Sequence, residues 1–319
     1  MRLARLGVAV IAALCAAAPA TGQTCGLTKV ATYDMESTDS GHVVIKMKIG
    51  DEERLMAVDT GAWFSHLTEE TVDALKLPHQ TSDQFISYDA YGRHSNEVAT
   101  APSLDIGPLK VRSVDFIIAP RGANFGKDVS GLLGGNVLKH FDLDFDFANR
   151  KFSLFDQDHC PGQVVYWTAS GFSKIPFEFN GSQITLPVTL DGHQMEAMLD
   201  TGAFASTIST PMANQIFDLT QSSADVDRTS HTDKDGTTWT DYTHVFNALR
   251  FGGMTIPSVT LHLVEDKMGK AVQQERASNN HELPLHLPQV LIGIEELRHL
   301  HLYISYKEKL LYVTVADAH

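Results

Sequence analysis

The sequence contains an internal duplication with a long period. Three short blocks each occur twice, and their copies follow one another in the same order along the chain. The blocks lie at residues 59–62 and 200–203, 104–107 and 249–252, and 132–134 and 291–293. In the first block an apolar run ends in Asp-Thr-Gly-Ala, and in the third two apolar residues precede a glycine. Blocks that return in one order at shifting offsets indicate a duplicated unit with insertions in its loops.

Both halves have the pattern of β-structure. Short runs rich in Val, Ile, Phe and Thr alternate with period two and are separated by Gly, Asp and Asn turns. A short helix is expected after each Asp-Thr-Gly, and Pro211 suits a helix start. A chain of 319 residues with 43% apolar residues is long enough for two domains with separate cores. We therefore predict a mostly β, bilobal fold of two related β-barrel-like halves with short helices.

The N-terminus has the three parts of a secretory signal peptide. Arg2 and Arg5 give a basic start, residues 6–17 are apolar, and residues 18–20 read Ala-Pro-Ala. The alternative is a single membrane anchor, but the apolar stretch is shorter than the roughly 20 residues that span a bilayer. We expect export to the periplasm or release from the cell, with no stable membrane association after cleavage.

Removal of this leader leaves two cysteines, Cys25 and Cys160. An oxidising compartment favours one disulfide between them, and two free thiols are the alternative. Two cysteines alone cannot form a structural zinc site. The expected segments are a signal peptide over 1–20, an N-terminal tail over 21–41, a first half over 42–156, a linker over 157–168 and a second half over 169–319.

The charge of the chain excludes several classes of partner. The formal net charge is −14 at pH 7, and removal of a leader with two arginines would bring it to −16. Such an acidic surface repels phosphate backbones and anionic lipids, so we expect no nucleic-acid partner. A metal site is not expected either, because Pro284 breaks the helix that His281 and His286 would need to form a zinc motif. His299 and His301 are expected on a solvated face.

The repeated aspartates can form a catalytic pair. If the two loops face each other, Asp59 and Asp200 come within hydrogen-bonding reach. Two such carboxyl groups cannot both ionise, so they share one proton. The ionised carboxylate can then deprotonate a water molecule, while the protonated one hydrogen-bonds the carbonyl under attack. This chemistry hydrolyses an amide without a metal or a covalent intermediate.

These motifs resemble those of the aspartic proteases. The two Asp-Thr-Gly-Ala motifs are similar to the active-site signature of that family, and the apolar-apolar-Gly triplets to the segment behind the active-site loop. Alanine after the glycine and the compact halves resemble retropepsins, which build their site from two chains, whereas this chain carries both halves, as pepsin does. The resemblance covers nearly all of residues 42–315. It implies a monomer without cofactor that acts on polypeptides, with catalytic Asp59 and Asp200 and active-site loops shaped by Thr60, Gly61, Ala62, Thr201, Gly202 and Ala203.

The family also covers its cleft with a hairpin. Tyr88 and Tyr91 lie at a predicted hairpin tip in the first half, and either could contact substrate or be an ordinary exposed turn residue. In the second half, residues 233–236 form the equivalent tip, with Trp239 nearby. Trp63, beside the first motif, either lines a substrate pocket or packs in the core.

The function expected from these features is that of an exported aspartic endopeptidase. The alternatives are a peptide-binding module that has lost turnover and a structural envelope protein, both on the same scaffold. Two intact Asp-Thr-Gly motifs argue against both alternatives.

Overall fold

The computed structural model describes residues 26–82, 86–123, 125–169, 171–180, 183–232, 236–267, 269–271 and 288–316. The predicted leader, Cys25, the 281–286 motif and residues 233–235 of the second hairpin tip lie outside these ranges. The fold is mostly β, as expected. No helix in the described ranges is long and apolar enough to cross a membrane.

The first half forms an eight-stranded sheet. The order in the sheet is β2-β3-β4-β11-β5-β10-β9-β6. The strands are β2 (Glu36–Ser37), β3 (Val43–Ile49), β4 (Glu52–Val58), β5 (His66–Leu67), β6 (His79–Thr81), β9 (Glu97–Ile106), β10 (Leu109–Ile118) and β11 (Gly131–Leu133). The helices α1 (Glu69–Leu75) and α2 (Gly135–Leu138) accompany it, and β7 (Ser87–Tyr88) and β8 (His94–Ser95) form a separate hairpin.

The second half repeats this sheet strand for strand. Its order is β15-β16-β17-β22-β18-β21-β20-β19. The strands are β15 (Glu178–Asn180), β16 (Gln183–Leu190), β17 (His193–Leu199), β18 (Thr207–Ser209), β19 (Asp227–Thr232), β20 (Thr238–Phe251), β21 (Met254–Val264) and β22 (Val290–Ile292), with helices α3 (Thr210–Phe217) and α5 (Ile294–Leu297). Even the extra pairing of β3 with β9 recurs, as β16 with β20. The predicted duplication therefore extends to the hydrogen-bonding pattern of the backbone.

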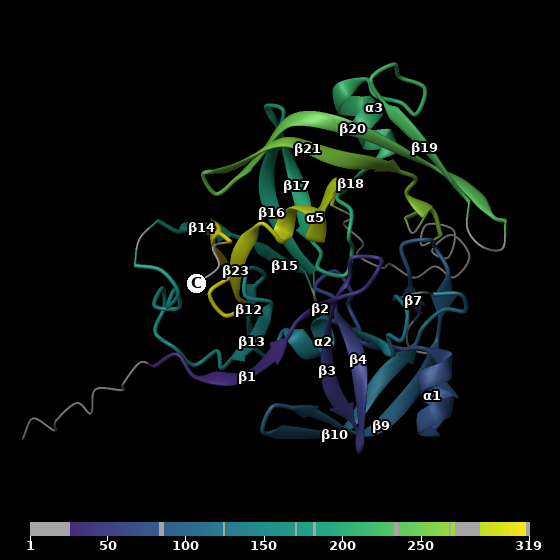
Figure 1. Ribbon diagram of the computed structural model, residues 1–319, viewed down its shortest axis with the longest axis vertical. Helices are drawn as coiled ribbons and strands as arrows, with labels where there is room; N and C mark the ends of the chain where they lie inside the picture. The colour runs from purple at the N-terminus through teal and green to yellow at the C-terminus, as the bar shows by residue number, and fades with distance from the viewer. Residues whose placement is uncertain are drawn as a thin grey trace, which may run out of the picture.

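A six-stranded sheet joins the two halves. Its order is β1-β13-β12-β23-β24-β14. The strands are β1 (Lys29–Asp34), β12 (Asp142–Asp146), β13 (Lys151–Phe155), β14 (Ser173–Pro176), β23 (Leu300–Ser305) and β24 (Leu310–Val315). Figure 1 shows the two eight-stranded sheets at the bottom and the top of the view, with this sheet to their left. The central pairing of β12 with β23 connects the first half to the second.

Equivalent glycines fix the contact of each lobe with the joining sheet. Gly107 and Gly252 each follow the long strand β9 or β20, and both have a φ of 54°, a left-handed conformation that favours glycine. A Cβ atom on Gly107 would lie 2.8 Å from the Cβ of Ala31 on β1. On Gly252 it would lie 2.1 Å from a side-chain carbon of Ile175 on β14. Both turns therefore need glycine for conformation and for close packing.

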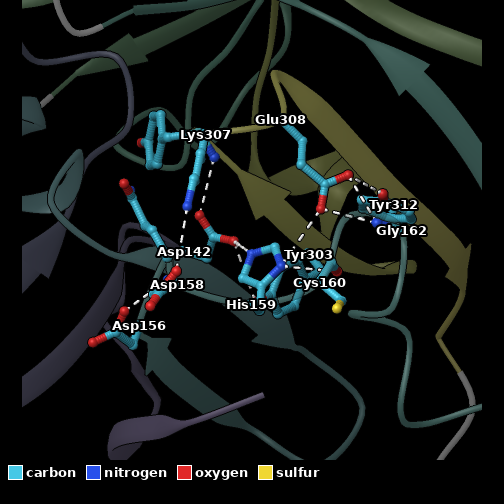
Figure 2. Close-up of polar contacts among 12 residues, drawn as sticks. Asp142, Asp156, Asp158, His159, Cys160, Gly162, Tyr303, Lys307, Glu308 and Tyr312 are labelled. Atoms are coloured by element: carbon cyan, nitrogen blue, oxygen red, sulfur yellow. Dashed lines mark hydrogen bonds and ion pairs between the residues drawn. The ribbon is translucent and has the colours of Figure 1, made fainter. Parts of the chain in front are cut away.

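The segment predicted as the linker packs on the joining sheet. Figure 2 shows His159 between Asp142 of β12 and Glu308. The His159 Nε2 lies 2.6 Å from an Asp142 carboxylate oxygen, and the two side chains are only 2% and 0% exposed. Gly162 donates its backbone N–H to Glu308 at 3.1 Å, and Tyr312 donates its hydroxyl to the same carboxylate at 2.6 Å. We call residues 157–168 the strap, because they cross this face of the sheet.

A second carboxylate–histidine pair lies beside the first. Asp144 is two residues beyond Asp142 on β12, so its side chain points to the same face. It accepts a hydrogen bond from the hydroxyl of Tyr166 and lies 2.7 Å from His301 Nε2. Trp167 of the strap stacks on His301, with ring centroids 4.1 Å apart. The expected solvated position is therefore wrong for His301, which is 4% exposed, and holds for the neighbouring exposed His299.

Cys160, within the strap, takes part in a disulfide. The other two cysteines lie outside the described residues, so its pairing with Cys25 stays a prediction.

The strap histidine gives a test of stability. His159→Ala should lower the free energy of unfolding by about 3 kcal/mol, because it removes the hydrogen bond between His159 and the buried Asp142 carboxyl group. Urea and thermal unfolding measure this change. His299→Ala, at an exposed position, is the matched control and should change stability by less than about 0.5 kcal/mol. Equal effects of the two substitutions would contradict this account of the strap.

Candidate active site

The two aspartates lie at equivalent strand ends. Asp59 follows β4 and Asp200 follows β17. The backbone N–H of Asp59 donates to the Leu133 carbonyl at 3.0 Å, and that of Asp200 donates to the Ile292 carbonyl at 3.0 Å. The apolar-apolar-Gly triplets therefore do lie directly behind the aspartates, as the resemblance implies.

Backbone amides of the loops hold each carboxylate. Gly61 and Ala62 donate to Asp59 Oδ1 at 2.9 and 2.8 Å, and Gly202 donates to Asp200 Oδ1 at 2.8 Å. An acceptor held by several N–H groups keeps one orientation and is stabilised in its ionised form.

The glycines of the two motifs allow the carboxyl groups to approach each other. A Cβ atom on Gly61 would lie 2.5 Å from the Asp200 Cγ, and on Gly202 it would lie 2.1 Å from the Asp59 Cγ. Each carboxyl group thus packs against the loop of the other half. Alanine at either position would collide with a carboxyl group, so the requirement is for space rather than for an unusual φ.

The two carboxyl groups share a hydrogen bond. Burial raises the pKa of Asp59 well above its ordinary value, and the nearby charge of Asp200 raises it further. Burial also raises the pKa of Asp200, but the hydrogen bond from Asp59 opposes this rise. The two carboxyl groups therefore titrate as one pair and share a single proton.

The threonines of the two motifs exchange hydrogen bonds between the halves. The Thr60 hydroxyl donates to the Leu199 carbonyl at 2.8 Å and accepts from the Thr201 N–H at 3.1 Å. The Thr201 hydroxyl donates to the Val58 carbonyl at 2.7 Å and accepts from the Thr60 N–H at 3.2 Å. Both threonines are fully buried. These four bonds hold the two strand ends, and hence the two aspartates, together.

A buried serine supports each loop from behind. Ser65 and Ser206 accept the N–H groups of Gly134 and Gly293 at 3.0 and 2.9 Å. The Ser65 hydroxyl donates to Asn136 at 2.8 Å, and the Ser206 hydroxyl donates to Glu296. The two serines follow the two Asp-Thr-Gly-Ala motifs at the same spacing in the sequence, whereas Asn136 and Glu296 were not predicted. Their signal was a polar residue two or three positions after each apolar-apolar-Gly triplet.

The hairpin candidates divide into exposed and half-buried residues. β7 and β8 pair Tyr88 with His94, and Tyr88 is half-buried whereas Tyr91 is 68% exposed. The base of this hairpin contacts β5, which follows the first active-site loop, because Ser87 Oγ lies 3.0 Å from the Nε2 of buried His66. Trp239 on β20 is 46% exposed and stacks on His231.

Trp63 is half-buried, and its carbonyl accepts the Asn136 N–H at 3.0 Å. Contact with substrate stays a prediction for Trp63 and for the hairpin residues Tyr88, Tyr91 and Trp239. Within the described ranges, no group of three or more His, Cys, Asp or Glu residues could hold a metal ion.

Comparisons with known proteins agree with this geometry. Residues 45–140 match the family model described as "gag-polyprotein putative aspartyl protease", and residues 186–295 match the model described as "Aspartyl protease". The chain therefore belongs to the aspartyl protease family, with two domains of that family in tandem. A comparison with curated proteins found no match.

Among solved structures, the fold is similar to basic 7S globulin from soybean. The TM-score is 0.50 at 10% sequence identity, over 92% of this chain and 96% of the globulin chain. At this identity the likeness concerns the fold alone.

The threonine exchange gives a second test. Thr60→Val should lower the free energy of unfolding by about 2–6 kcal/mol, because it leaves the buried Leu199 carbonyl and Thr201 N–H unsatisfied, at about 1–3 kcal/mol each. Thr60→Ser keeps the hydroxyl and is the matched control. Urea unfolding of both variants measures the difference. If valine and serine are equally tolerated, the exchange does not hold the halves together.

Proposed function

We propose that this protein is an aspartic endopeptidase in which Asp59 and Asp200 activate a water molecule for peptide hydrolysis. The observation that supports this proposal is the geometry of the pair: two buried carboxyl groups, one from each half, hydrogen-bonded to one another and sharing one proton. Buried pairs whose pKa values are pushed apart are characteristic of acid–base catalysis.

The proposed reaction uses the two carboxyl groups in opposite roles. Ionised Asp200 accepts a proton from water as the water oxygen attacks the scissile carbonyl carbon. Protonated Asp59 donates its proton to the carbonyl oxygen, which gives a neutral tetrahedral diol. The new proton on Asp200 then passes to the leaving nitrogen while Asp59 takes a proton back from the diol. The carbon–nitrogen bond breaks, and the pair returns to its starting state.

The loops supply the remaining requirements of this reaction. The N–H groups of Gly61, Ala62 and Gly202 fix the orientation of the carboxylates, so little reorganisation is needed during proton transfer. The buried threonine exchange keeps the two carboxyl groups at one separation. A polypeptide is the proposed substrate, because this acid–base chemistry suits an amide bond.

We also propose that the protein is exported and has no stable membrane association. The leader-like residues 1–20 support export, and so does the disulfide at Cys160, because structural disulfides persist in oxidising compartments. The periplasm and the extracellular medium both fit this proposal. A single chain that carries both halves of its site needs no partner chain, which supports a monomer.

The catalytic pair is tested by substitution. Asp59→Asn and Asp200→Asn should each lower kcat/KM on a denatured protein substrate by about 1,000-fold or more, and the double variant should be little worse, because residues that act as a unit fail together. Asp51→Asn, in the exposed turn between β3 and β4, is the control and should keep full activity. Wild-type activity in either Asn variant would place the site elsewhere.

The same variants distinguish a single-chain site from a shared one. Specific activity should not change with protein concentration, and mixing the two Asn variants should restore nothing. Recovery on mixing would instead indicate a site formed between two chains.

The variants also have a stability readout that does not depend on a substrate. Burial raises the pKa of Asp59 in the folded protein, so the protonated form of Asp59 contributes to stability. This contribution is complete below about pH 4, the pKa of aspartate in the unfolded chain, and is lost as the pH rises through the folded pKa. Asp59→Asn removes this loss. The variant should therefore gain thermal stability relative to wild type as the pH is raised from 4 to 7.

The disulfide is tested by peptide mapping. Under non-reducing conditions the exported protein should yield a peptide that links Cys25 with Cys160, and reduction should separate its two parts. Free-thiol labelling of both residues in the purified exported protein would contradict this pairing.

A further inference from the structure

One peptide group links Asp200 to a buried serine. The carbonyl of the Ile292–Gly293 peptide accepts the Asp200 N–H at 3.0 Å, and the N–H of the same peptide donates to the Ser206 hydroxyl at 2.9 Å. The first half has the same link. The carbonyl of the Leu133–Gly134 peptide accepts the Asp59 N–H at 3.0 Å, and the N–H of that peptide donates to the Ser65 hydroxyl at 3.0 Å. A peptide group that accepts and donates at once passes polarisation from one bond to the next.

The two links end on different chemical groups. In the first half, Asn136 Oδ1 accepts both the hydroxyl and the backbone N–H of Ser65, at 2.8 and 2.7 Å. In the second half, the Ser206 hydroxyl donates to a carboxyl oxygen of Glu296 on α5. Asparagine does not titrate, whereas Glu296 can gain or lose a proton. The two halves therefore have equivalent hydrogen bonds from the aspartate to the serine, and they differ in the side chain that accepts the serine hydroxyl.

The surroundings of Glu296 favour its neutral form. Glu296 is 6% exposed and Ser206 is fully buried, and this burial raises the pKa of Glu296 to about 7. Glu295 on the same helix raises the pKa further, while Arg298 and the Ser206 hydrogen bond lower it. The described residues of β18 and β22 carry no titratable side chain. On β23, His301 hydrogen-bonds Asp144 and Tyr303 hydrogen-bonds Asp142. On β21, the backbone N–H of His262 donates to the Ser206 carbonyl at 2.9 Å.

We propose that Glu296 is a positioning residue for Asp200. The protonation state of Glu296 acts through Ser206 and the Ile292–Gly293 peptide and changes how firmly the second catalytic loop is held. This inference rests on the proposed function and adds a control to the same site. When Glu296 is ionised, each bond of the chain donates toward it: Asp200 N–H to peptide, peptide to Ser206, Ser206 to carboxylate. Such a charge-assisted, aligned chain holds the Asp200 backbone more firmly.

Protonation of Glu296 removes the charge at the end of this chain. A neutral carboxyl group is a weaker acceptor for the Ser206 hydroxyl, so every bond back to Asp200 weakens. The first catalytic loop keeps its neutral Asn136 acceptor at every pH. Asp200 and Asp59 therefore respond differently to a change in pH near neutrality, although their loops are otherwise equivalent.

The pH profile of kcat/KM tests this proposal. The profile of wild type should contain an ionisation near pH 7 that is absent from Glu296→Gln, and the ratio of the two kcat/KM values should change by about 5-fold across it, the lower limit typical of coupled sites. Glu295→Gln, which removes the neighbouring carboxyl group on the same helix, is the matched control and should keep the ionisation. A profile that is identical in wild type and Glu296→Gln would overturn the proposal.

The first half allows the reverse experiment. Asn136→Asp places a titratable acceptor at the end of the other chain and should add an ionisation that wild type lacks. Because this variant and Glu296→Gln alter different halves, a folding defect in one leaves the other informative. An unchanged profile in Asn136→Asp would count against transmission through the serine and the peptide.

A stability cycle separates failure of this inference from failure of the proposed function. The shift in melting temperature caused by Asp200→Asn should differ between the wild-type and Glu296→Gln backgrounds, because the two residues are coupled. The difference should grow as the pH rises through about 7, because Glu296 then ionises in the folded protein whereas glutamine stays neutral. Equal shifts in both backgrounds would overturn the coupling even if no variant hydrolysed any peptide, whereas unequal shifts without hydrolysis would reject only the proposed function.

Discussion

The buried exchange between Thr60 and Thr201 determines the geometry of the site. Each hydroxyl donates to a carbonyl of the opposite half and accepts an N–H from it. In a buried position no water molecule replaces a missing partner, so the loss of any one of these hydrogen bonds would destabilise the folded protein. The separation of the two aspartates follows from it, and the glycines leave room for the carboxyl groups. The joining sheet and the strap fix the same two halves from the other side.

Much of this architecture could be predicted from the sequence, because the residues that both halves need occur twice in it. Asp-Thr-Gly recurs since both halves need the carboxyl group, the hydroxyl and the space. The apolar triplets recur since both aspartates need a carbonyl behind them. Asn136 and Glu296 could not be predicted in the same way, because the two halves use different side chains at different offsets from the glycine. Comparison of the two halves therefore identifies what they share, but it does not identify the Asn136 and Glu296 side chains in which they differ.

The strap shows a second limit of sequence reasoning. Polar residues are typical of a solvated segment, yet the His159 side chain is buried because Asp142 on β12 lies beside it. The same holds for His301 and Asp144. A polar residue can be buried when a partner satisfies it, and such a partner is fixed by the fold and not by neighbours in the sequence. Periodicity predicts which faces are apolar, but it does not predict which polar groups meet inside.

The position of β12 in the joining sheet has a consequence for biosynthesis. Its neighbour β13 follows within a few residues, but its other neighbour, β23, is made only after residues 147–299 have been translated. Until then β12 is an edge strand, open to pairing with other chains. Asp142, Asp144 and Asp146 place three carboxylates along one face of that open edge, and charged residues of this kind disfavour association with a second chain. Two of these carboxyl groups, Asp142 and Asp144, thus occupy the exposed edge first and contact His159 and His301 only in the complete fold.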